Sequence, residues 1–243
     1  MRIAVAGATG QVGRQVVEQA EAQGHEVVKL ARSTGFDLTK PDERLVDALR
    51  GVEAVVEATA SPTSDGEEAR AFFTAVAENL GRAASAAGVQ RTVVLSIVGT
   101  DLTPDFPYYV AKTEQENVAR TYAPGARIVR ATQFHEFPGQ LIDWYGDGIS
   151  VPVLDAPTQT VDTAEVAAVL LAVATGELSG DVDVAGPKAE YLPDLVEREI
   201  AHRGLDLKVE LGPTPETFRQ GSMLPGPSAL LRGTDWETWR QGR

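Results

Sequence analysis

Three polar side chains have the types and the spacing for acid–base chemistry on a small substrate. Tyr108 and Lys112 are four residues apart, so on one helix they share a face, and the ammonium would favour ionisation of the phenol. A phenol, whose ordinary pKa is about 10, needs such help to exchange protons at neutral pH. Ser96, at the end of an apolar run, would hold the same substrate oxygen by a hydrogen bond. The alternative is that Tyr108 and Lys112 only pack against neighbours and contact solvent.

A glycine-rich segment near the N-terminus lies between an apolar run and a helical pattern. Its glycines, Gly7, Gly10 and Gly13, follow one another at spacings of three. Gly7 can make the turn out of the strand, Gly10 admits a pyrophosphate close to the backbone, and Gly13 lets the helix pack tightly. The free N–H groups at the helix start attract phosphate. In the first βα turn this pattern predicts dinucleotide binding, and the alternative is an ordinary tight turn.

The residues after the second apolar run indicate which dinucleotide would bind. An acidic residue beyond Leu30 would hydrogen-bond the ribose 2′-hydroxyl of NAD, but this chain has Arg32-Ser33. An arginine can pair with a 2′-phosphate, so we predict NADP(H), with NAD(H) as the second choice. The alternative is that Arg32 is a solvated loop charge.

Further cofactor contacts are expected where the next elements begin and end. Asp37-Leu38 would lie beside the adenine, although Asp37 or Thr39 would serve equally well as a cap for a helix near Pro41. Lys112 would contact the nicotinamide ribose. The full set of predicted cofactor contacts is Gly7, Thr9, Gly10, Gln11, Val12, Arg32, Ser33, Asp37, Leu38, Ala58, Thr59, Ala60, Lys112 and Thr132.

These residues are positioned by a regular alternation of short apolar runs and longer helical patterns. Alternation of this kind predicts an α/β fold with a doubly wound parallel sheet of the Rossmann type. The runs are continuous rather than alternating, as expected for strands covered by helices on both faces. The expected strands are residues 3–6, 26–30, 54–56, 92–95, 126–129 and 182–184, and the expected helices are 11–22, 41–49, 66–87, 108–121 and 163–175.

The alternation loosens after Phe134, where glycine and proline in residues 142–159 predict turns and short strands. We therefore expect a single domain over residues 1–243. Its Rossmann core would cover about 1–134 together with a returning strand near 181–186. A small C-terminal substrate cap, made from about 135–160 and 187–243, would lie over the ligand edge of the sheet.

The glycine motif of residues 7–13, with Ser96, Tyr108 and Lys112, resembles the short-chain dehydrogenase/reductase superfamily, and its spacing is similar to the atypical, NmrA-like branch. The resemblance extends to residues 83–89, 130–134 and 233–236. It implies NAD(P)(H) binding, a catalytic Ser, Tyr and Lys, and a position near the nicotinamide for Thr132, Gln133 and Phe134. The expected activity is NADP(H)-dependent reduction of a small carbonyl, quinone-like or enone substrate with Tyr108 as proton donor. Because some atypical members act as redox sensors with little turnover, a regulatory protein is the alternative.

Substrate contacts are predicted where the fifth strand ends and in the segment after it. His135 could reach the substrate or be an ordinary histidine at a helix start, and Trp144 with Tyr145 could line a pocket under the cap or belong to the core. The predicted substrate-binding residues are Tyr109, Gln133, Phe134, His135 and Trp144.

Composition excludes several other function classes. A formal net charge of −13 disfavours nucleic acid and anionic membranes, so the expected partner is a small molecule, with a homodimer or a protein partner left open. The three histidines lack metal-ligand spacing and there is no cysteine, so no metal site is expected. With no signal-peptide pattern and no run of about 20 apolar residues, we expect a cytoplasmic protein.

Overall fold

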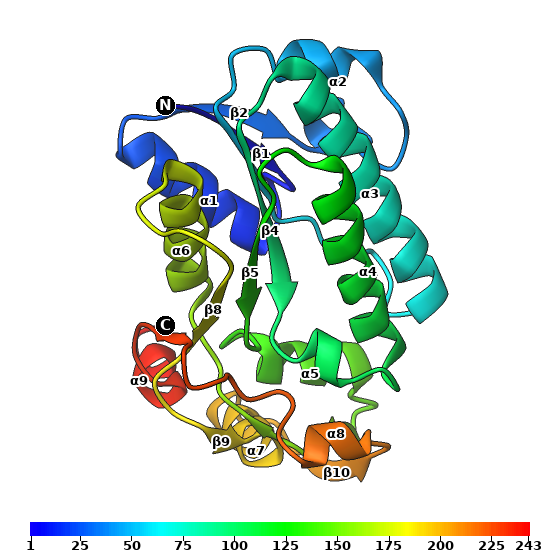
Figure 1. The fold of residues 1–243 in the computed structure, drawn as a ribbon. Coiled ribbons are helices and arrows are strands. Elements are labelled where there is room, and N and C mark those ends of the chain that lie inside the picture. The colour runs from blue at the N-terminus through cyan, green and yellow to red at the C-terminus, as the bar shows by residue number, and fades with distance from the viewer. The chain divides into compact units, whose positions relative to one another are not determined.

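The structure is a computed structural model that describes residues 1–243. The chain divides into two compact units, the first made of residues 1–130 and 163–182 and the second of residues 131–162 and 183–243 (Figure 1). These boundaries lie close to the predicted division between core and cap segments. The single-domain organisation itself stays a prediction.

The first unit is built on parallel strands. They are β1 (Arg2–Ala6), β2 (Glu26–Leu30), β3 (Ala54–Glu57), β4 (Arg91–Ile97) and β5 (Arg127–Ala131), which except for β2 are buried along most of their length. With β8 (Val182–Ala185) and β11 (Leu230–Leu231), the central sheet has seven strands in the order β11-β8-β5-β4-β3-β1-β2. Because β2 lies on one side of β1 and β3 on the other, the chain reverses its direction of winding at β1, where open α/β sheets bind ligands. The predicted Rossmann-type fold is confirmed.

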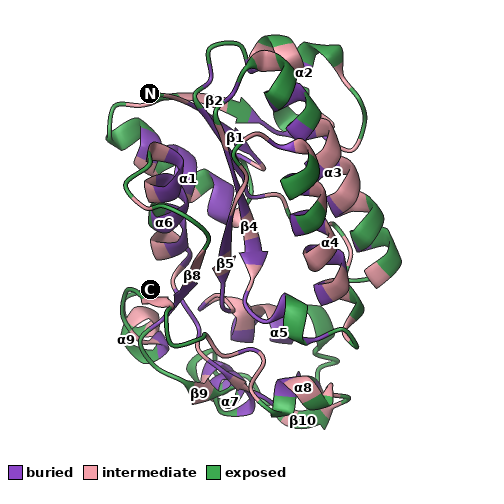
Figure 2. Cartoon of the chain, in the orientation of Figure 1, coloured by how far each residue is buried: buried purple, intermediate pink, exposed green.

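Helices cover both faces of the sheet in the first unit (Figure 1). The helix α1 (Gln11–Ala22) packs against α6 (Thr163–Thr175), while α3 (Gly66–Ala87) packs against both α2 (Glu43–Ala48) and α4 (Pro107–Tyr122) on the opposite face. Apart from β2 at the sheet edge, the strands are mostly buried, as are the inward faces of these helices, whereas the outward faces of the helices are largely exposed (Figure 2). Two short 3₁₀ turns, η1 (Arg32–Thr34) and η2 (Thr100–Leu102), follow β2 and β4.

The ends of these helices follow from their local chemistry. Asp65 caps α3 by accepting hydrogen bonds from the N–H groups of Glu67 and Glu68, and Gly88 ends the helix with a φ of +78°. The expected bounds of α1, α3 and α6 are confirmed. The expectation that Asp37 or Thr39 caps α2 is wrong, because α2 begins later and its cap is Asp42, which accepts a hydrogen bond from the backbone of Arg44.

The second unit has its own small core. This core is formed by α5 (Phe137–Tyr145), β6 (Ser150–Leu154) and α7 (Leu192–His202), which contribute Leu141, Val151, Leu192 and Val196. The strand β6 pairs in parallel with β10 (Lys208–Gly212), and β7 (Pro157–Thr158) pairs antiparallel with β9 (Glu190–Tyr191). The remaining helices are α8 (Glu216–Arg219) and α9 (Trp236–Gln241). The expected turns over residues 142–159 begin only after Tyr145, because α5 continues to that residue.

None of the helices combines enough length with enough apolar character to cross a bilayer.

Candidate functional site

The carboxyl ends of β1, β2 and β3 lie level with one another in the first unit. Ala6 is in register with Leu30 on one side and with Glu57 on the other. The amide of Gly7 donates to the carbonyl oxygen of Leu30 at 2.9 Å, and the amide of Ala58 donates to that of Ala6 at 2.9 Å. The glycine turn, the residues after β2 and the residues after β3 therefore meet at one edge of the sheet.

The glycine turn is packed so closely that two of its positions exclude a side chain. Gly7 has a φ of +77°, and a Cβ there would lie 2.5 Å from the carbonyl oxygen of Ala58. A Cβ on Gly13 would lie 2.1 Å from the carbonyl oxygen of Gly7, so this glycine brings α1 against the turn. Gly10 is exposed, and a Cβ there would lie 3.2 Å from the carbonyl oxygen of Gly7, a less severe contact than at the other two glycines. The turn predicted at Gly7 and the close packing predicted at Gly13 are present, and the approach of a pyrophosphate to Gly10 stays a prediction.

The N-terminal end of α1 lacks the groups that usually satisfy a helix start. Its N-cap residue is Gly10, no side chain caps the helix, and its first turn contains no acidic residue. The helix α3, in contrast, is capped by Asp65 and carries Glu67 and Glu68 in its first turn. An exposed helix start without a side-chain cap suits the phosphates of a dinucleotide. The residues present therefore fit the predicted cofactor.

Arg32 and Ser33 are both exposed at the start of η1. The guanidinium of Arg32 forms no ion pair or side-chain hydrogen bond, although most arginines of this acidic chain pair with a carboxylate. Asp37 lies in a turn that it stabilises itself. Its carboxylate accepts a 2.6 Å hydrogen bond from the hydroxyl of Thr39, which lowers the pKa of Asp37. Leu38 is buried in the core formed with α2 and α3.

The residues after β3 differ in exposure. Ala58 is buried beneath the glycine turn, Thr59 is half-buried and Ala60 is exposed. The hydroxyl of Thr59 donates to a carboxylate oxygen of Glu57 at 3.1 Å. Their predicted contact with the ribose stays a prediction.

Ser96 lies one residue before the end of β4 and is 2% exposed. Its hydroxyl oxygen has no hydrogen-bond partner within the protein. A buried hydroxyl without a partner costs about 1–3 kcal/mol. Such a group is therefore expected where a ligand supplies the partner.

Tyr108 begins α4 half-buried, with its ring edge-on to Phe73 at a centroid distance of 5.8 Å. Burial raises the pKa of this phenol. The hydrogen bonds of the Lys112 ammonium go to Leu95 and Gln115, and the expectation that it favours ionisation of Tyr108 stays a prediction. Tyr109 is buried and packs edge-on against Phe106 at 5.4 Å.

Lys112 is buried, and its ammonium bridges two elements of the first unit. The Nζ atom donates to the carbonyl oxygen of Leu95 at 2.8 Å and to Oε1 of Gln115, and it lies 4.3 Å from the ring centroid of Phe73. Burial lowers the pKa of Lys112 to about 8, against the opposing influence of Glu57 and Glu116. The bond to Leu95 ties α4 to the strand residue that precedes Ser96.

Sequence reasoning missed the polar residues around this lysine. The side-chain amide of Gln115 donates to Oε1 of Glu57 at 2.5 Å, and both residues are almost fully buried. The signal in the sequence was Glu57 itself, a glutamate at the end of an otherwise apolar strand. Its link to Lys112 through Gln115 could not be predicted, because spacing along the chain does not reveal contacts between a strand and a helix.

The predicted residues of the second unit lie together where β5 ends. The hydroxyl of Thr132 donates to the carbonyl oxygen of Gln159 at 2.5 Å, and Gln133 accepts from the hydroxyl of Thr158 at 2.8 Å. Phe134 forms an isolated parallel bridge with Val161. Their predicted positions near the nicotinamide and the substrate stay predictions.

His135 is buried and contacts the C-terminal segment. Its Nδ1 lies 2.8 Å from the hydroxyl of Thr160, and its Nε2 lies 3.2 Å from the carbonyl oxygen of Thr234. Its own carbonyl oxygen accepts from the indole of Trp236 at 3.0 Å. Burial lowers the pKa of His135. These contacts favour the structural alternative that the sequence left open for this residue.

Trp144 is 59% exposed and packs edge-on against Tyr145, which is 47% exposed. The alternative that these two aromatic residues belong to the core is therefore wrong. They lie at the C-terminal end of α5, after its buried residues Leu141 and Ile142.

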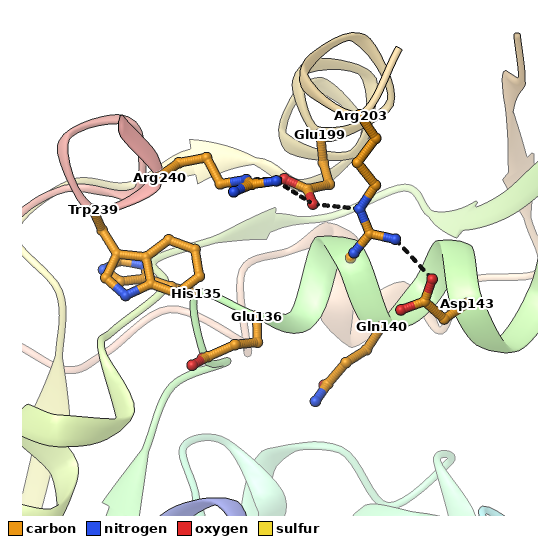
Figure 3. Close-up of a pocket in the computed structure, with 9 residues that line it drawn as sticks. His135, Glu136, Gln140, Asp143, Glu199, Arg203, Trp239 and Arg240 are labelled. Carbon is orange, nitrogen blue, oxygen red and sulfur yellow. Dashed lines mark hydrogen bonds and ion pairs between the residues drawn. The ribbon is translucent and has the colours of Figure 1, made fainter. Parts of the chain in front are cut away.

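The second unit also contains a cavity of about 310 Å³ among residues of α5, α7 and α9 (Figure 3). Glu199 lies between Arg203 and Arg240, at 2.6 Å and 2.7 Å, and Arg203 also pairs with Asp143 at 2.7 Å. The ring of Trp239 lies 5.1 Å from that of His135. Four of the charged groups that line this cavity therefore pair with one another, while Glu136 pairs with Arg243 at 3.7 Å and its Oε2 is buried without a hydrogen bond. The sequence indicated this network only through the four-residue spacing of Glu199 and Arg203.

Known proteins that are similar to this chain include an assembly factor and a reductase. The "Photosystem II assembly factor Ycf39" of Synechocystis is 36% identical over 121 residues, which are 44% of this chain and 37% of that protein. The "(4-alkanoyl-5-oxo-2,5-dihydrofuran-3-yl)methyl phosphate reductase" of Streptomyces griseus is 30% identical over 207 residues, which are 77% of this chain and 68% of that protein. The match thus spans little more than a third of the first relative and about two thirds of the second.

Structural similarity extends over almost the whole chain. A dTDP-4-dehydrorhamnose reductase from Bacillus anthracis, solved in complex with NADP, superposes with a TM-score of 0.72 at 15% identity and covers 99% of this chain and 96% of its own. This likeness supports the fold alone. The NAD(P)H-binding family matches residues 32–177, more than half of the sequence. Together with the sheet order and the glycine turn, this match places the chain in the NAD(P)H-binding family.

Proposed function

We propose that this chain is an NADPH-dependent oxidoreductase that reduces a small carbonyl, quinone-like or enone substrate. The observation that carries the proposal is the buried hydroxyl of Ser96, which has no hydrogen-bond partner. Ser96 follows Leu95, whose carbonyl oxygen accepts a hydrogen bond from the Lys112 ammonium. In a family that binds NAD(P)H, a hydroxyl left open at the ligand edge of the sheet suits a substrate oxygen.

Three residues of the first unit would each have a separate role in the reduction. When bound, a reduced nicotinamide would supply a hydride. Tyr108 would donate its phenolic proton to the substrate, and the raised pKa keeps this phenol protonated at neutral pH, which is the form that a proton donor needs. Ser96 would donate a hydrogen bond to the substrate oxygen. Lys112 would hold α4 against β4 and present its remaining N–H toward the nicotinamide ribose.

The substrate class is supported by one relative. The Streptomyces griseus protein is named as a reductase of an alkanoyl- and oxo-substituted dihydrofuran, and such unsaturated carbonyl compounds belong to the enone class. Among the three substrate types, the enone is therefore the first to test.

The preference for NADP(H) is supported by Arg32. Its guanidinium is exposed beyond β2 and has no partner, so it is available to a 2′-phosphate. No acidic residue stands at that position to bind an unmodified ribose.

Replacement of the proposed proton donor tests the function. In Tyr108→Phe, NADPH consumption with an enone substrate should fall roughly 10²- to 10⁴-fold, while NADPH affinity stays within about twofold. Tyr122→Phe is the matched control, because Tyr122 ends the same helix and its ring lies against the Arg82 guanidinium. Equal turnover by Tyr108→Phe and the unmodified protein would overturn the role of Tyr108.

The alternative is a regulatory protein that responds to the redox state of the cofactor without turnover. It is favoured by the relative that is named as an assembly factor. A sensor must bind the oxidised and the reduced cofactor with different affinities, since equal affinity shifts no equilibrium. Equal dissociation constants for NADP⁺ and NADPH in a calorimetric titration would rule out this alternative, and unequal constants without turnover would support it.

A further inference from the structure

A buried chain of polar groups links β3 to the ammonium of Lys112. Glu57, at the end of β3, accepts from the amide nitrogen of Gln115 at 2.5 Å, and Oε1 of Gln115 accepts from Nζ of Lys112. Glu57 is 1% exposed, Gln115 is 0% and Lys112 is 4%. The side-chain amide of Gln115 accepts from Lys112 through its oxygen and donates to Glu57 through its nitrogen. Both hydrogen bonds are therefore donated in the direction from the lysine to the carboxylate.

The ammonium needs a counter-ion because it is almost completely withdrawn from solvent. Its other contacts, the carbonyl oxygen of Leu95 on β4 and the ring of Phe73 on α3, are uncharged. Two carboxylates act on Lys112, Glu57 from β3 and Glu116 from its own helix. These groups are the ones that decide whether the lysine keeps its charge.

Of these two carboxylates, Glu116 is already engaged. Arg130 on β5 donates to both of its oxygens, at 2.9 Å and 2.7 Å, so its charge is largely compensated. Glu57 contacts no cation directly and receives only neutral donors, from Gln115 and Thr59. Burial raises the pKa of Glu57, and Lys112, Gln115 and Thr59 oppose that rise, so the charge of this carboxylate and that of the lysine depend on each other.

We infer that Glu57 is a positioning residue that acts through Gln115 to hold the Lys112 ammonium in place and in its charged form. The inference rests on the proposed function for its catalytic meaning, because Lys112 is the residue proposed to contact the cofactor ribose. The chain of hydrogen bonds links β3, which precedes the residues predicted to contact the ribose, with α4, which carries the proposed proton donor. Both ends of the chain lie in the first unit.

The pKa of Lys112 measures this role directly. Removing the charge of Glu57 removes an influence that opposes burial, so the pKa of Lys112 should fall below about 8. We expect a fall of roughly one pH unit in Glu57→Gln. Glu57→Asp keeps the charge on a shorter side chain and should restore much of the loss.

The measurement uses the full chain with ¹³Cε-labelled lysine, titrated by NMR. The sequence has five lysines, of which Lys112 is the buried one, and Lys112→Arg identifies its signal. Glu114→Gln is the matched control, because it removes one negative charge from the same helix at a residue that pairs instead with Arg70. This control should leave the pKa of Lys112 unchanged.

A pKa of Lys112 that is the same in Glu57→Gln, Glu114→Gln and the unmodified protein would overturn the inference, because Glu57 would then be uncharged when Lys112 titrates. If Glu57→Gln does not fold, Gln115→Met decides. It breaks the chain of hydrogen bonds while Glu57 remains, and an unchanged pKa would again overturn the inference.

The titration needs no turnover, so its failure can be told apart from failure of the proposed function. Where turnover is observed, its loss at high pH should follow deprotonation of Lys112 and move to lower pH in Glu57→Gln. A protein without turnover in which Glu57→Gln still lowers the pKa of Lys112 would contradict the enzymatic proposal alone.

Discussion

The sheet edge of the first unit and the cavity of the second unit both carry polar and charged groups, but the two regions differ in whether these groups have partners within the protein. In the cavity, Glu199 binds two arginines and one of these binds Asp143, so each charge is neutralised within the protein. At the sheet edge, Ser96 and Arg32 have no partner and α1 has no cap. Two polar atoms among the residues that line the cavity lack a hydrogen-bond partner, the indole N–H of Trp239 and Oε2 of Glu136.

The difference separates a site that needs a ligand from a network that stabilises a fold. Buried polar groups are nearly always hydrogen-bonded, and exceptions concentrate where function requires them. A group of open donors at the switch point of a Rossmann sheet fits phosphates and a substrate oxygen. A closed set of ion pairs among α5, α7 and α9 fits the packing of short helices.

The largest expected effect is at the glycine turn. Gly7→Ala combines a left-handed φ of +77° with a Cβ 2.5 Å from the Ala58 carbonyl oxygen. We expect a loss of about 3–5 kcal/mol in the free energy of unfolding, together with loss of NADPH binding. Urea unfolding and a fluorescence titration with NADPH measure the two effects.

Gly24→Ala is the matched control for this prediction. Gly24 has a similar φ of +79°, but nothing lies within 4 Å of the added Cβ. It should therefore cost only about 1–2 kcal/mol and leave NADPH binding intact. Equal effects of the two substitutions would show that the close contact of the turn is unimportant.

The next effect is in the closed network of the second unit. Glu199→Gln leaves two arginines without their shared carboxylate, and because both remain partly exposed we expect a loss of about 2–3 kcal/mol on urea unfolding. NADPH affinity should not change, since this network is proposed to be structural. A weaker NADPH affinity in a folded Glu199→Gln protein would break the contrast between the two regions.

An exposed pair gives the reference for that measurement. Glu78 and Arg82 have the same four-residue spacing as Glu199 and Arg203, but both lie on the solvent side of α3. Glu78→Gln should lower the free energy of unfolding far less than Glu199→Gln, because exposed ion pairs contribute little. Similar losses would mean that burial of Glu199 does not strengthen its network.

Much of the first unit was predictable from the sequence because its signals are local. Continuous apolar runs predicted the strands, and glycines after the helices predicted their ends, where Gly24, Gly51, Gly88 and Gly125 all have positive φ. The glycine turn was predictable for the same reason, since its three positions are neighbours in the chain. The predicted start of α2 was wrong, because several residues near Pro41 are able to cap a helix.

The polar contacts of the site were less predictable because they join residues that are distant in the sequence. The link between Glu57 and Gln115 crosses from a strand to a helix 58 residues away. The direction of the Lys112 ammonium depends on Leu95 and Phe73, which spacing along α4 does not reveal. Whether Trp144 and His135 are buried could not be predicted either, because the neighbouring residues in the sequence fit both a buried and an exposed side chain.

The central claim is that the sheet edge of the first unit binds NADP(H), with Arg32 at the 2′-phosphate. Calorimetric titration of NADPH and NADH into the unmodified protein and Arg32→Ala tests it most directly. We expect NADPH to bind more tightly than NADH, and Arg32→Ala to weaken NADPH about 10- to 100-fold while NADH changes little. Binding of neither dinucleotide to the unmodified protein, or an unchanged ratio of the two affinities in Arg32→Ala, would contradict the account.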